Sequence, residues 1–358
     1  MKHDDRRNQQ QSAAEKWTAF KALLSDRIRR IRARKDELLG TQRGRRIAYA
    51  SLGGLILIVV IIIAAAASCR SGRDETIRTA SPGLPKLGAV LASLSLAPEE
   101  QSSPDRLVLS GAGHTLILKA GSSSADLDGI PVAMPGNAEI AADGSWEIPA
   151  DAASTLLLPV LNGSRIPVRS IVIDPGHGGN DRGTATALGH LEKDLNLLLA
   201  MELAKELRQA GFNVSLTRTD DRFIPLELRP DFAAKQRADL FVSIHHNASA
   251  ANPEAAGPEI YVLDGQTPEQ IETSGKSCFT AFAMCQELLS SGLLPMRGVK
   301  RADFKVLRLS PCPAVLVEAG FLTNPAEADR LVTIRNRRAI AAALAAAIKR
   351  STVRQSAE

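Results

Sequence analysis

Residues 238–248 read ADLFVSIHHNA, and the interpretation of the whole chain starts from this stretch. The segment from Leu240 to Ile244 is an almost uninterrupted apolar run, which is typical of a strand buried on both faces of a sheet. The run ends in His245 and His246, two side chains that can bind metals or carry protons. Because side chains alternate along a strand, the two histidines should face opposite sides of the sheet. From these residues alone, either histidine can belong to a functional site.

Two other apolar runs end in residues of a similar kind. IVIDPGHGG (171–179) leads through a glycine turn to His177, and PAVLVEAGFL (313–322) carries Glu318. In open α/β sheets, functional residues collect at the carboxyl ends of the strands. A buried cluster of histidines and carboxylates is costly there unless a metal or a reaction stabilises it. The glycine spacing around His177 matches neither a P-loop nor a dinucleotide fingerprint, which argues against a phosphate-binding loop.

A fourth segment, LEKDLNLLL (191–199), opens a predicted helix and carries Glu192. The four segments therefore supply three candidate histidines, His177, His245 and His246, and two glutamates, Glu192 and Glu318. Two histidines and one glutamate form a ligand set typical of catalytic zinc, which keeps one position open for water. The second glutamate can then act as the base that takes a proton from that water.

Strand-like and helix-like segments alternate over residues 168–350. FNVSLTR (212–218) and EIYVL (259–263) have strand patterns, and residues 269–290 and 336–350 have helical ones. The leucines predicted to line one face of the helix that begins near Glu192 are Leu195, Leu198, Leu199, Leu203 and Leu207. Continuous aliphatic strands separated by helices predict an α/β fold, with a mostly parallel sheet flanked by helices.

The sequence before this region has a different pattern. Residues 106–167 contain short strand-like runs separated by glycine and Asp-Gly turns, and we expect a small β-rich domain there. TLLLPVL (155–161) is counted among its strands. Residues 69–105 are mixed polar with Ser-Pro breaks and are predicted to be a linker. Residues 351–358 are predicted to be a C-terminal tail.

The positive charge of the chain is concentrated at its start. The formal net charge is +5, but residues 1–46 alone contain fourteen Lys and Arg against six Asp and Glu. The remainder is therefore slightly acidic, which argues against nucleic acid as a partner. We interpret residues 1–46 as a basic cytoplasmic tail.

Residues 47–68 contain no charged side chain, and about 20 such residues span a bilayer as a helix. The basic tail before them keeps the N-terminus in the cytoplasm by the positive-inside rule. We therefore predict a single-pass anchor in the cytoplasmic (inner) membrane, with the remaining chain facing the periplasm or cell wall. An alternative is that residues 66–69 form a lipoprotein processing site at which Cys69 is acylated. Both alternatives tether the main domain outside the cytoplasm.

Three further cysteines, Cys278, Cys285 and Cys312, are interpreted as buried free thiols. The chain has no CxxC pattern, so a cysteine zinc site is disfavoured. Cys278 and Cys285 are too far apart along a predicted helix to bridge each other. A disulfide from one of them to Cys312 stays an open alternative.

The segments quoted above resemble a known family. DPGHGG at 174–179, the glutamate before a leucine-rich helix, ADLFVSIH at 238–245 and PAVLVEAGFLTN at 313–324 are similar in order and spacing to the zinc-dependent N-acetylmuramoyl-L-alanine amidases of the amidase-3 type. The resemblance covers residues 169–350. A Pro-Leu-x-x-Arg stretch ending at Arg229 fits the same pattern and implies a structural or substrate-contacting role for that arginine.

The resemblance implies a cell-wall hydrolase. It implies that His177, Glu192 and His245 bind Zn²⁺ and that Glu318 is the catalytic glutamate. It implies peptidoglycan as the substrate, cleaved at the amide between the lactyl group of N-acetylmuramic acid and L-alanine of the stem peptide. Two alternatives stay open, a non-catalytic peptidoglycan-binding anchor and a zinc hydrolase of another cell-wall amide. The β-rich segment 106–167 loosely resembles the stalk-type domain named after the N-terminal domain of copper amine oxidases.

Overall fold

A computed structural model describes residues 97–98, 103–111, 113–161, 163–292 and 295–354. All of these residues belong to one compact unit, Pro82–Glu358. The predicted basic tail, the predicted membrane segment 47–68 and Cys69 lie outside the described residues. Within the described part of the chain, no helix is both long enough and apolar enough to span a bilayer.

The secondary structure over the described ranges alternates as expected after residue 165. The strands are β1 (Ala97–Pro98), β2 (Arg106–Gly111), β3 (His114–Lys119), β4 (Ser124–Leu127), β5 (Ile130–Ala133), β6 (Glu139–Ile140), β7 (Trp146–Glu147), β8 (Ile166–Val168), β9 (Ser170–Pro175), β10 (Asn213–Leu216), β11 (Leu240–Asn247), β12 (Glu259–Leu263), β13 (Gly298–Ala302), β14 (Ala314–Phe321) and β15 (Thr352–Arg354). The helices are α4 (Ala150–Ala152), the π-helical turn η1 (Ala153–Leu157), α5 (Leu158–Leu161), α6 (Glu192–Gln209), α7 (Leu228–Lys235), α8 (Pro268–Ser290), α9 (Lys305–Arg308), α10 (Pro325–Leu331) and α11 (Ile334–Ser351).

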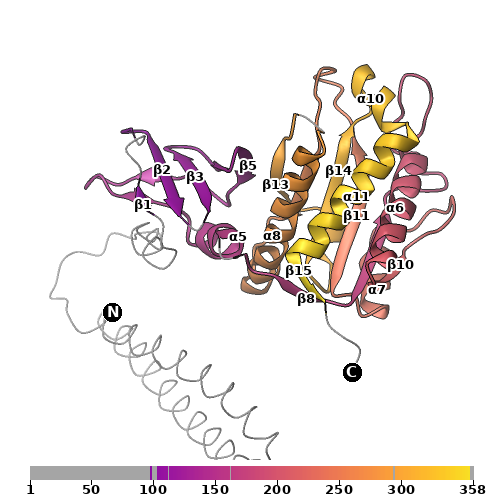
Figure 1. Cartoon of the computed structure of the whole chain (residues 1–358), viewed down its shortest axis with the longest axis horizontal. Helices are drawn as coiled ribbons and strands as arrows, with labels where there is room; N and C mark the ends of the chain where they lie inside the picture. Colours follow the sequence, from indigo (N-terminus) through magenta and orange to yellow (C-terminus); the bar gives the residue numbers. More distant parts are fainter. Residues whose placement is uncertain (1–96, 99–102, 112, 162, 293–294, 355–358) are drawn as a thin grey trace, which may run out of the picture. The chain divides into compact units, whose positions relative to one another are not determined.

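One eleven-stranded sheet organises the unit, in the order β1-β2-β3-β4-β5-β13-β12-β14-β11-β9-β10 (Figure 1). Strands β14, β11, β9 and β10 are parallel neighbours, and β13 is parallel to β12. The pairing of β12 with β14 is antiparallel. The predicted α/β fold with a mostly parallel sheet is therefore confirmed for this half of the sheet.

Helices cover the two faces of this half unequally. The long helices α8, α11 and α6 lie side by side over one face (Figure 1), where they bury an aliphatic core. On the other face the short helices α7 and α9 pack on a smaller cluster that includes Phe241 and Leu316. This second face is covered by shorter helices than the first, and a pocket lined by His245 and Glu318 lies on it.

The leucine stripe of α6 is narrower than predicted. Leu195, Leu199, Leu203 and Leu207 are buried, but Leu198 is 42% exposed. The buried four repeat every fourth residue and so follow one line along the helix, whereas Leu198 lies at the edge of that line. Leu198 as a core residue was therefore a wrong prediction.

Four antiparallel strands, β2 to β5, lie in the segment predicted to be β-rich. Strand β5 also pairs with β13 through Val132 and Val299, so these strands continue the main sheet. The assignment of residues 106–167 to a separate domain stays a prediction. TLLLPVL (155–161), predicted as a strand, is helical, because the alanine-rich sequence before it favours a helix that packs against α8.

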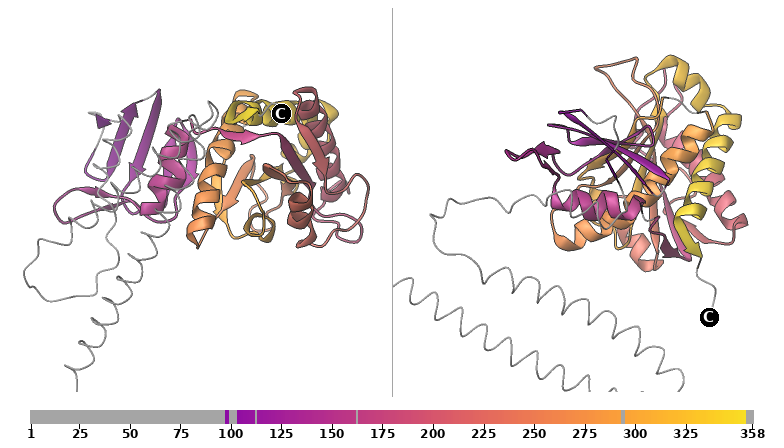
Figure 2. Two further views of the ribbon diagram at one scale, coloured as in Figure 1. Left: turned by 90° about the horizontal axis from the view of Figure 1, so that it is seen from below. Right: turned by 60° about the vertical axis from the view of Figure 1, so that its left-hand side comes forward.

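The C-terminal strand β15 pairs in parallel with β8 (Figures 1 and 2), so Thr352–Arg354 is ordered strand within the stretch expected to be a tail. Cys278, Cys285 and Cys312 are free and buried, as predicted. Burial raises the pKa of the Cys312 thiol to about 11 and that of Cys285 further still, which keeps both thiols protonated at neutral pH.

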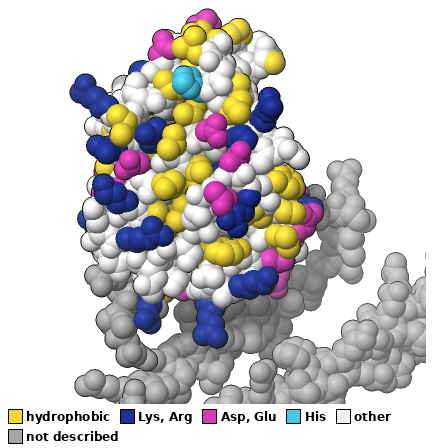
Figure 3. All heavy atoms as spheres, turned by 90° about the vertical axis from the view of Figure 1, so that its right-hand side faces the viewer, with side chains coloured by type: hydrophobic (Ala, Val, Ile, Leu, Met, Phe, Trp, Pro, Cys, Tyr) yellow, Lys and Arg dark blue, Asp and Glu magenta, His cyan; other side chains and the backbone are white. Residues whose placement is uncertain are grey.

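Lys and Arg side chains are interspersed with Asp and Glu side chains on the face seen in Figure 3. Mixed charge of this kind gives a surface without a strong field of one sign. The basic segment of the chain, residues 1–46, is not among the described residues.

Candidate functional site

The predicted site residues meet at one edge of the sheet because neighbouring parallel strands end together. Ser243 of β11 pairs with Asp174 of β9, and His245 pairs with Glu318 of β14. Paired residues on adjacent strands point to the same face of the sheet. Asp174, Ser243, His245 and Glu318 therefore share the face that α7 and α9 leave partly open.

Glycines make room for two of the site side chains. A Cβ atom on Gly176 would lie 2.1 Å from Cε1 of His245, and one on Gly183 would lie 2.4 Å from Oε2 of Glu192. Real Cβ atoms do not approach other atoms so closely, so a larger residue at either position would displace the histidine or the glutamate. His177, which follows Gly176, has a φ of 58° and so lies in the left-handed region of backbone conformations.

His177, Glu192 and His245 form a compact cluster. Oε1 of Glu192 lies 3.0 Å from Nε2 of His177 and 3.0 Å from Nδ1 of His245. The two imidazole rings are edge to face, with centroids 5.0 Å apart. Glu192 reaches them because it is the first residue of α6, and its other oxygen accepts a hydrogen bond of 2.9 Å from the backbone N–H of Thr184.

The charges of the cluster are strongly coupled. Burial opposes ionisation of Glu192, but its bonds to His177 and His245 outweigh this and hold its pKa well below the usual value. Burial likewise lowers the pKa of His177, yet the contacts with Glu192 and with Asp181, whose Oδ2 lies 2.8 Å from Nδ1, raise it overall. The cluster therefore favours an anionic Glu192, whose charge in turn favours the protonated form of His177.

The donor set fits a zinc ion. One donor atom from each of His177, Glu192 and His245 lies within 4.8 Å of the other two. Ligands about 2.0–2.1 Å from a tetrahedral ion are roughly 3.4 Å apart, so a small movement of these side chains would admit one. Nearby, the buried Oε2 of Glu318 has no hydrogen-bond partner among the described residues. An orphaned buried carboxylate oxygen is consistent with a group that completes the site.

Glu318 lies next to the cluster but is not one of the three clustered residues. It lines a pocket of about 380 Å³ together with His177, His245, Phe223 and Phe304. Burial raises the pKa of Glu318 well above the usual value, and the charges of Glu192 and Glu259 raise it further. A carboxylate in such surroundings readily takes up a proton, which is what a general base does.

The second histidine of the pair faces away from the cluster. His246 is buried on the α6 side of the sheet, and its Nδ1 lies 2.7 Å from Oδ1 of Asn196. Burial lowers the pKa of His246 to about 4, which keeps the ring neutral at physiological pH. Of the two histidines that strand alternation left open, the structure brings His245 to the cluster.

Arg229 is a buried anchor of the His177 loop. It is 2% exposed, and its Nη1 donates to Oδ1 of Asp174 at 2.9 Å. Its Nη2 donates to the carbonyl of His177 at 3.0 Å, which holds the backbone of that turn. Of the two roles implied for this arginine, the contacts favour the structural one. Removing one partner from a buried ion pair of this kind costs about 3–5 kcal/mol.

Several residues of the site were not found from the sequence. Arg218, at the end of FNVSLTR, donates from Nη2 to the carbonyls of Gly176 and Lys193 and supports the same turn. Glu259 of β12 pairs with Glu318 in the antiparallel register and is 4% exposed. A buried charge in an apolar strand was the available signal for Glu259; Arg218 carried no comparable signal.

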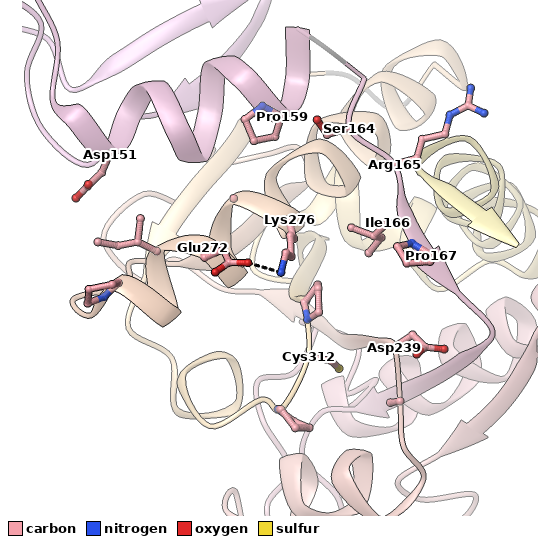
Figure 4. Close-up of a pocket in the computed structure, with 16 residues that line it drawn as sticks. Asp151, Pro159, Ser164, Arg165, Ile166, Pro167, Asp239, Glu272, Lys276 and Cys312 are labelled. Carbon is pink, nitrogen blue, oxygen red and sulfur yellow. Dashed lines mark hydrogen bonds and ion pairs between the residues drawn. The ribbon is translucent and has the colours of Figure 1, made fainter. Parts of the chain in front are cut away.

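A second, larger cleft lies elsewhere. It has a volume of about 900 Å³ and is lined by residues near the starts of β11 and β14, including Asp239 and Cys312 (Figure 4). Glu272 and Lys276, one turn apart on α8, form an ion pair of 2.7 Å along one wall of it. No histidine is among its lining residues, so the smaller pocket at the opposite strand ends is the candidate site.

Comparison with known proteins agrees with this geometry. The family model for N-acetylmuramoyl-L-alanine amidase (Amidase_3) matches residues 171–350, which contain the whole cluster. The chain belongs to the N-acetylmuramoyl-L-alanine amidase family. The matched range begins in β9 and ends in α11, so it contains the strands and helices that form the amidase site.

Relatives of this amidase family differ in how much of their length is shared. The uncharacterized protein YqiI of Bacillus subtilis is 39% identical over 46% of this chain and 75% of its own length. N-acetylmuramoyl-L-alanine amidase AmiA of Escherichia coli is 33% identical over 49% of this chain and 74% of its own length. AmiC of Neisseria meningitidis is 36% identical over 53% of each chain, so this chain spans about half of that relative. The solved structure of AmiC2 of Nostoc punctiforme is 34% identical, covering 51% of this chain and 95% of its own, with a TM-score of 0.46.

Proposed function

We infer that this protein is a peptidoglycan amidase, which hydrolyses the amide between the lactyl group of N-acetylmuramic acid and L-alanine of the stem peptide. The single observation that carries the proposal is the cluster of His177, Glu192 and His245 beside the buried Glu318. Membership of the N-acetylmuramoyl-L-alanine amidase family supports the choice of this amide bond.

Zinc is the proposed cofactor, held by His177, Glu192 and His245. Two histidines and one glutamate form a ligand set used by catalytic zinc. When bound, the ion would supply Lewis-acid polarisation of the scissile carbonyl and of a water. The contact of Asp181 with Nδ1 of His177 supports the orientation of that imidazole, as carboxylate partners do for metal-ligating histidines.

Glu318 is the proposed proton carrier. Its Oε2, which has no hydrogen-bond partner in the described part of the chain, takes the proton from the attacking water as the new C–O bond forms. It then delivers that proton to the departing nitrogen of L-alanine as the C–N bond breaks. The partly exposed side chains of Phe223 and Phe304 line the same pocket and give it apolar walls beside the reacting groups.

The location of the enzyme is also a proposal. We propose that residues 47–68 anchor the chain as a single span in the cytoplasmic membrane, with the amidase facing the periplasm or cell wall. The support is the absence of charge in this segment and the basic tail before it. Protease added to intact spheroplasts should digest the amidase region; full protection of that region would contradict this orientation. Residues 106–167 are proposed as a spacer or peptidoglycan-binding segment.

Digestion of purified sacculi by the full chain tests the proposed function. We expect release of free stem peptides that begin with L-alanine, detected by mass spectrometry. A chelator should stop the release, and added zinc should restore it. Intact sacculi with bound protein would favour a non-catalytic binding role instead. Cleavage at another amide would retain the zinc chemistry but replace the substrate bond.

A further inference from the structure

Arg297 is held by three contacts beside β14, the strand that carries Glu318. It directly precedes β13, and its Nε donates to Oε1 of Glu259 at 2.6 Å. Its guanidinium carbon lies 5.2 Å from the ring centroid of Phe321, the last residue of β14. Its backbone N–H donates to the carbonyl of Pro258 at 3.0 Å. These three contacts fix both the backbone and the plane of the guanidinium.

The terminal nitrogens of this arginine are available. Nε makes the bond to Glu259, but Nη1 and Nη2 have no hydrogen-bond or ion-pair partner among the described residues. The side chain is 41% exposed, whereas that of Glu259 is 6% exposed. A guanidinium can donate two parallel hydrogen bonds to one carboxylate through its terminal nitrogens. Arg297 can therefore bind a second carboxylate, one that comes from solution.

Both carboxylate oxygens of Glu259 accept hydrogen bonds, and one of these bonds holds Arg297 in place. Its Oε2 accepts hydrogen bonds from Nδ2 of Asn247 at 2.9 Å and from the hydroxyl of Tyr261 at 2.8 Å. With Arg297 on Oε1, both oxygens of this buried carboxylate are satisfied. An arginine required only to neutralise Glu259 would gain more from a bidentate pair. The observed single contact instead leaves its outer edge free.

The distance from the catalytic glutamate suits a peptide substrate. Glu259 lies opposite Glu318 in the sheet, and β13 is the next strand beyond β12. Strands are about 4.8 Å apart, so the start of β13 is roughly 10 Å from Glu318. The side chain of Arg297 extends over the end of β14, where its guanidinium carbon lies 5.2 Å from the ring centroid of Phe321. Two extended residues span about 7 Å, so the second residue after the scissile carbonyl can reach Arg297.

We propose that Arg297 binds the free α-carboxylate of the second stem-peptide residue, a D-glutamate linked through its γ-carboxyl group. This inference rests on the proposed function, since it names the part of the peptidoglycan stem that the site recognises. The first residue, L-alanine, is neutral, and the γ-linkage leaves the α-carboxylate of the next residue free. A cation is needed to receive that carboxylate, because Glu192, Glu259 and Glu318 would otherwise repel it.

Three synthetic peptides test the proposal with the full chain. They are L-Ala-γ-D-Glu-L-Lys, the same peptide amidated at the D-glutamate α-carboxylate, and the isomer amidated at the lysine carboxylate. Isothermal titration calorimetry should give similar Kd values for the first and third peptides and a Kd about 10-fold higher for the second. Arg297→Gln should bind all three as weakly as the parent binds the second. Arg297→Lys keeps the positive charge but cannot donate two parallel hydrogen bonds. It should retain part of the preference for the peptides with a free D-glutamate α-carboxylate.

Lys276→Gln, which removes a positive charge on α8 far from the site, is the matched control and should keep the full preference. Equal binding of all three peptides by the parent chain would overturn the proposal, even if Arg297→Gln failed to fold. So would an Arg297→Gln variant that retained the preference. Hydrolysis of the corresponding N-acetylmuramoyl tripeptides is read separately. A binding preference without hydrolysis would contradict the proposed amidase function and leave the role of Arg297 intact.

Discussion

Replacing Glu318 by glutamine is expected to lower the rate of stem-peptide release by about 10²–10⁴-fold, the usual contribution of a general acid–base group. Glutamine has the same shape but cannot take a proton from water. Glu318 is outside the set of three clustered donors, so the variant should keep the metal content of the parent chain. Mass spectrometry of released peptides and elemental analysis of zinc in the same samples measure both quantities.

Glu272→Gln is a matched control for this experiment. It removes a carboxylate from α8, at the cleft of Figure 4, and should leave turnover unchanged. Undiminished activity of Glu318→Gln would contradict the role of Glu318 as base. Loss of zinc from that variant would instead make Glu318 a ligand, and the assignment of the three donors would then be wrong.

Replacing His245 by alanine is expected to weaken zinc binding by more than about 100-fold. Outer partners of a metal site typically contribute 10–100-fold in affinity, and a direct donor should contribute more. The expectation follows from the position of Nδ1 of His245, 3.0 Å from Oε1 of Glu192. Competition with a chromogenic chelator measures the affinity, and turnover should fall in parallel.

His246→Ala supplies the adjacent control, because His246 is the next residue along β11 but lies on the opposite face of the sheet. His246 contacts Asn196 on the α6 side, so its loss should change zinc affinity by no more than about tenfold. Circular dichroism should show both variants folded before affinities are compared. If folded His246→Ala lost zinc as fully as His245→Ala, the geometric assignment of the ligand histidine would be refuted.

This pair of histidines also shows what a sequence can and cannot predict about the site. Alternation along β11 predicts that His245 and His246 face opposite ways, and the structure agrees. Which face carries the site depends on where α6 packs and where its first residue, Glu192, points. That information is tertiary, and no pattern within residues 238–248 contains it.

The fold follows the same division between local and tertiary information. The buried strands β9, β11 and β14 were predicted because continuous aliphatic runs are local signals. TLLLPVL has an equally apolar sequence, yet it is helical, because the alanine-rich residues before it favour a helix and an apolar run alone does not distinguish a strand from a buried helix. Arg297 and Glu259 are 38 positions apart and belong to no motif, so only the register of β12 and β13 brings them together.

The pairing of β5 with β13 has a consequence for how the amidase can be isolated. Without β5, strand β13 would end the sheet and present a row of unpaired backbone N–H and C=O groups to solvent. Arg301, which now donates to the carbonyl of Ala133 and to Oγ1 of Thr155, would lose both partners. Exposed edges of this kind recruit strands from other chains and promote aggregation. The segment before residue 171 therefore covers an edge of the sheet through β5. A protein trimmed to residues 171–350 would expose that edge and would be more prone to aggregate.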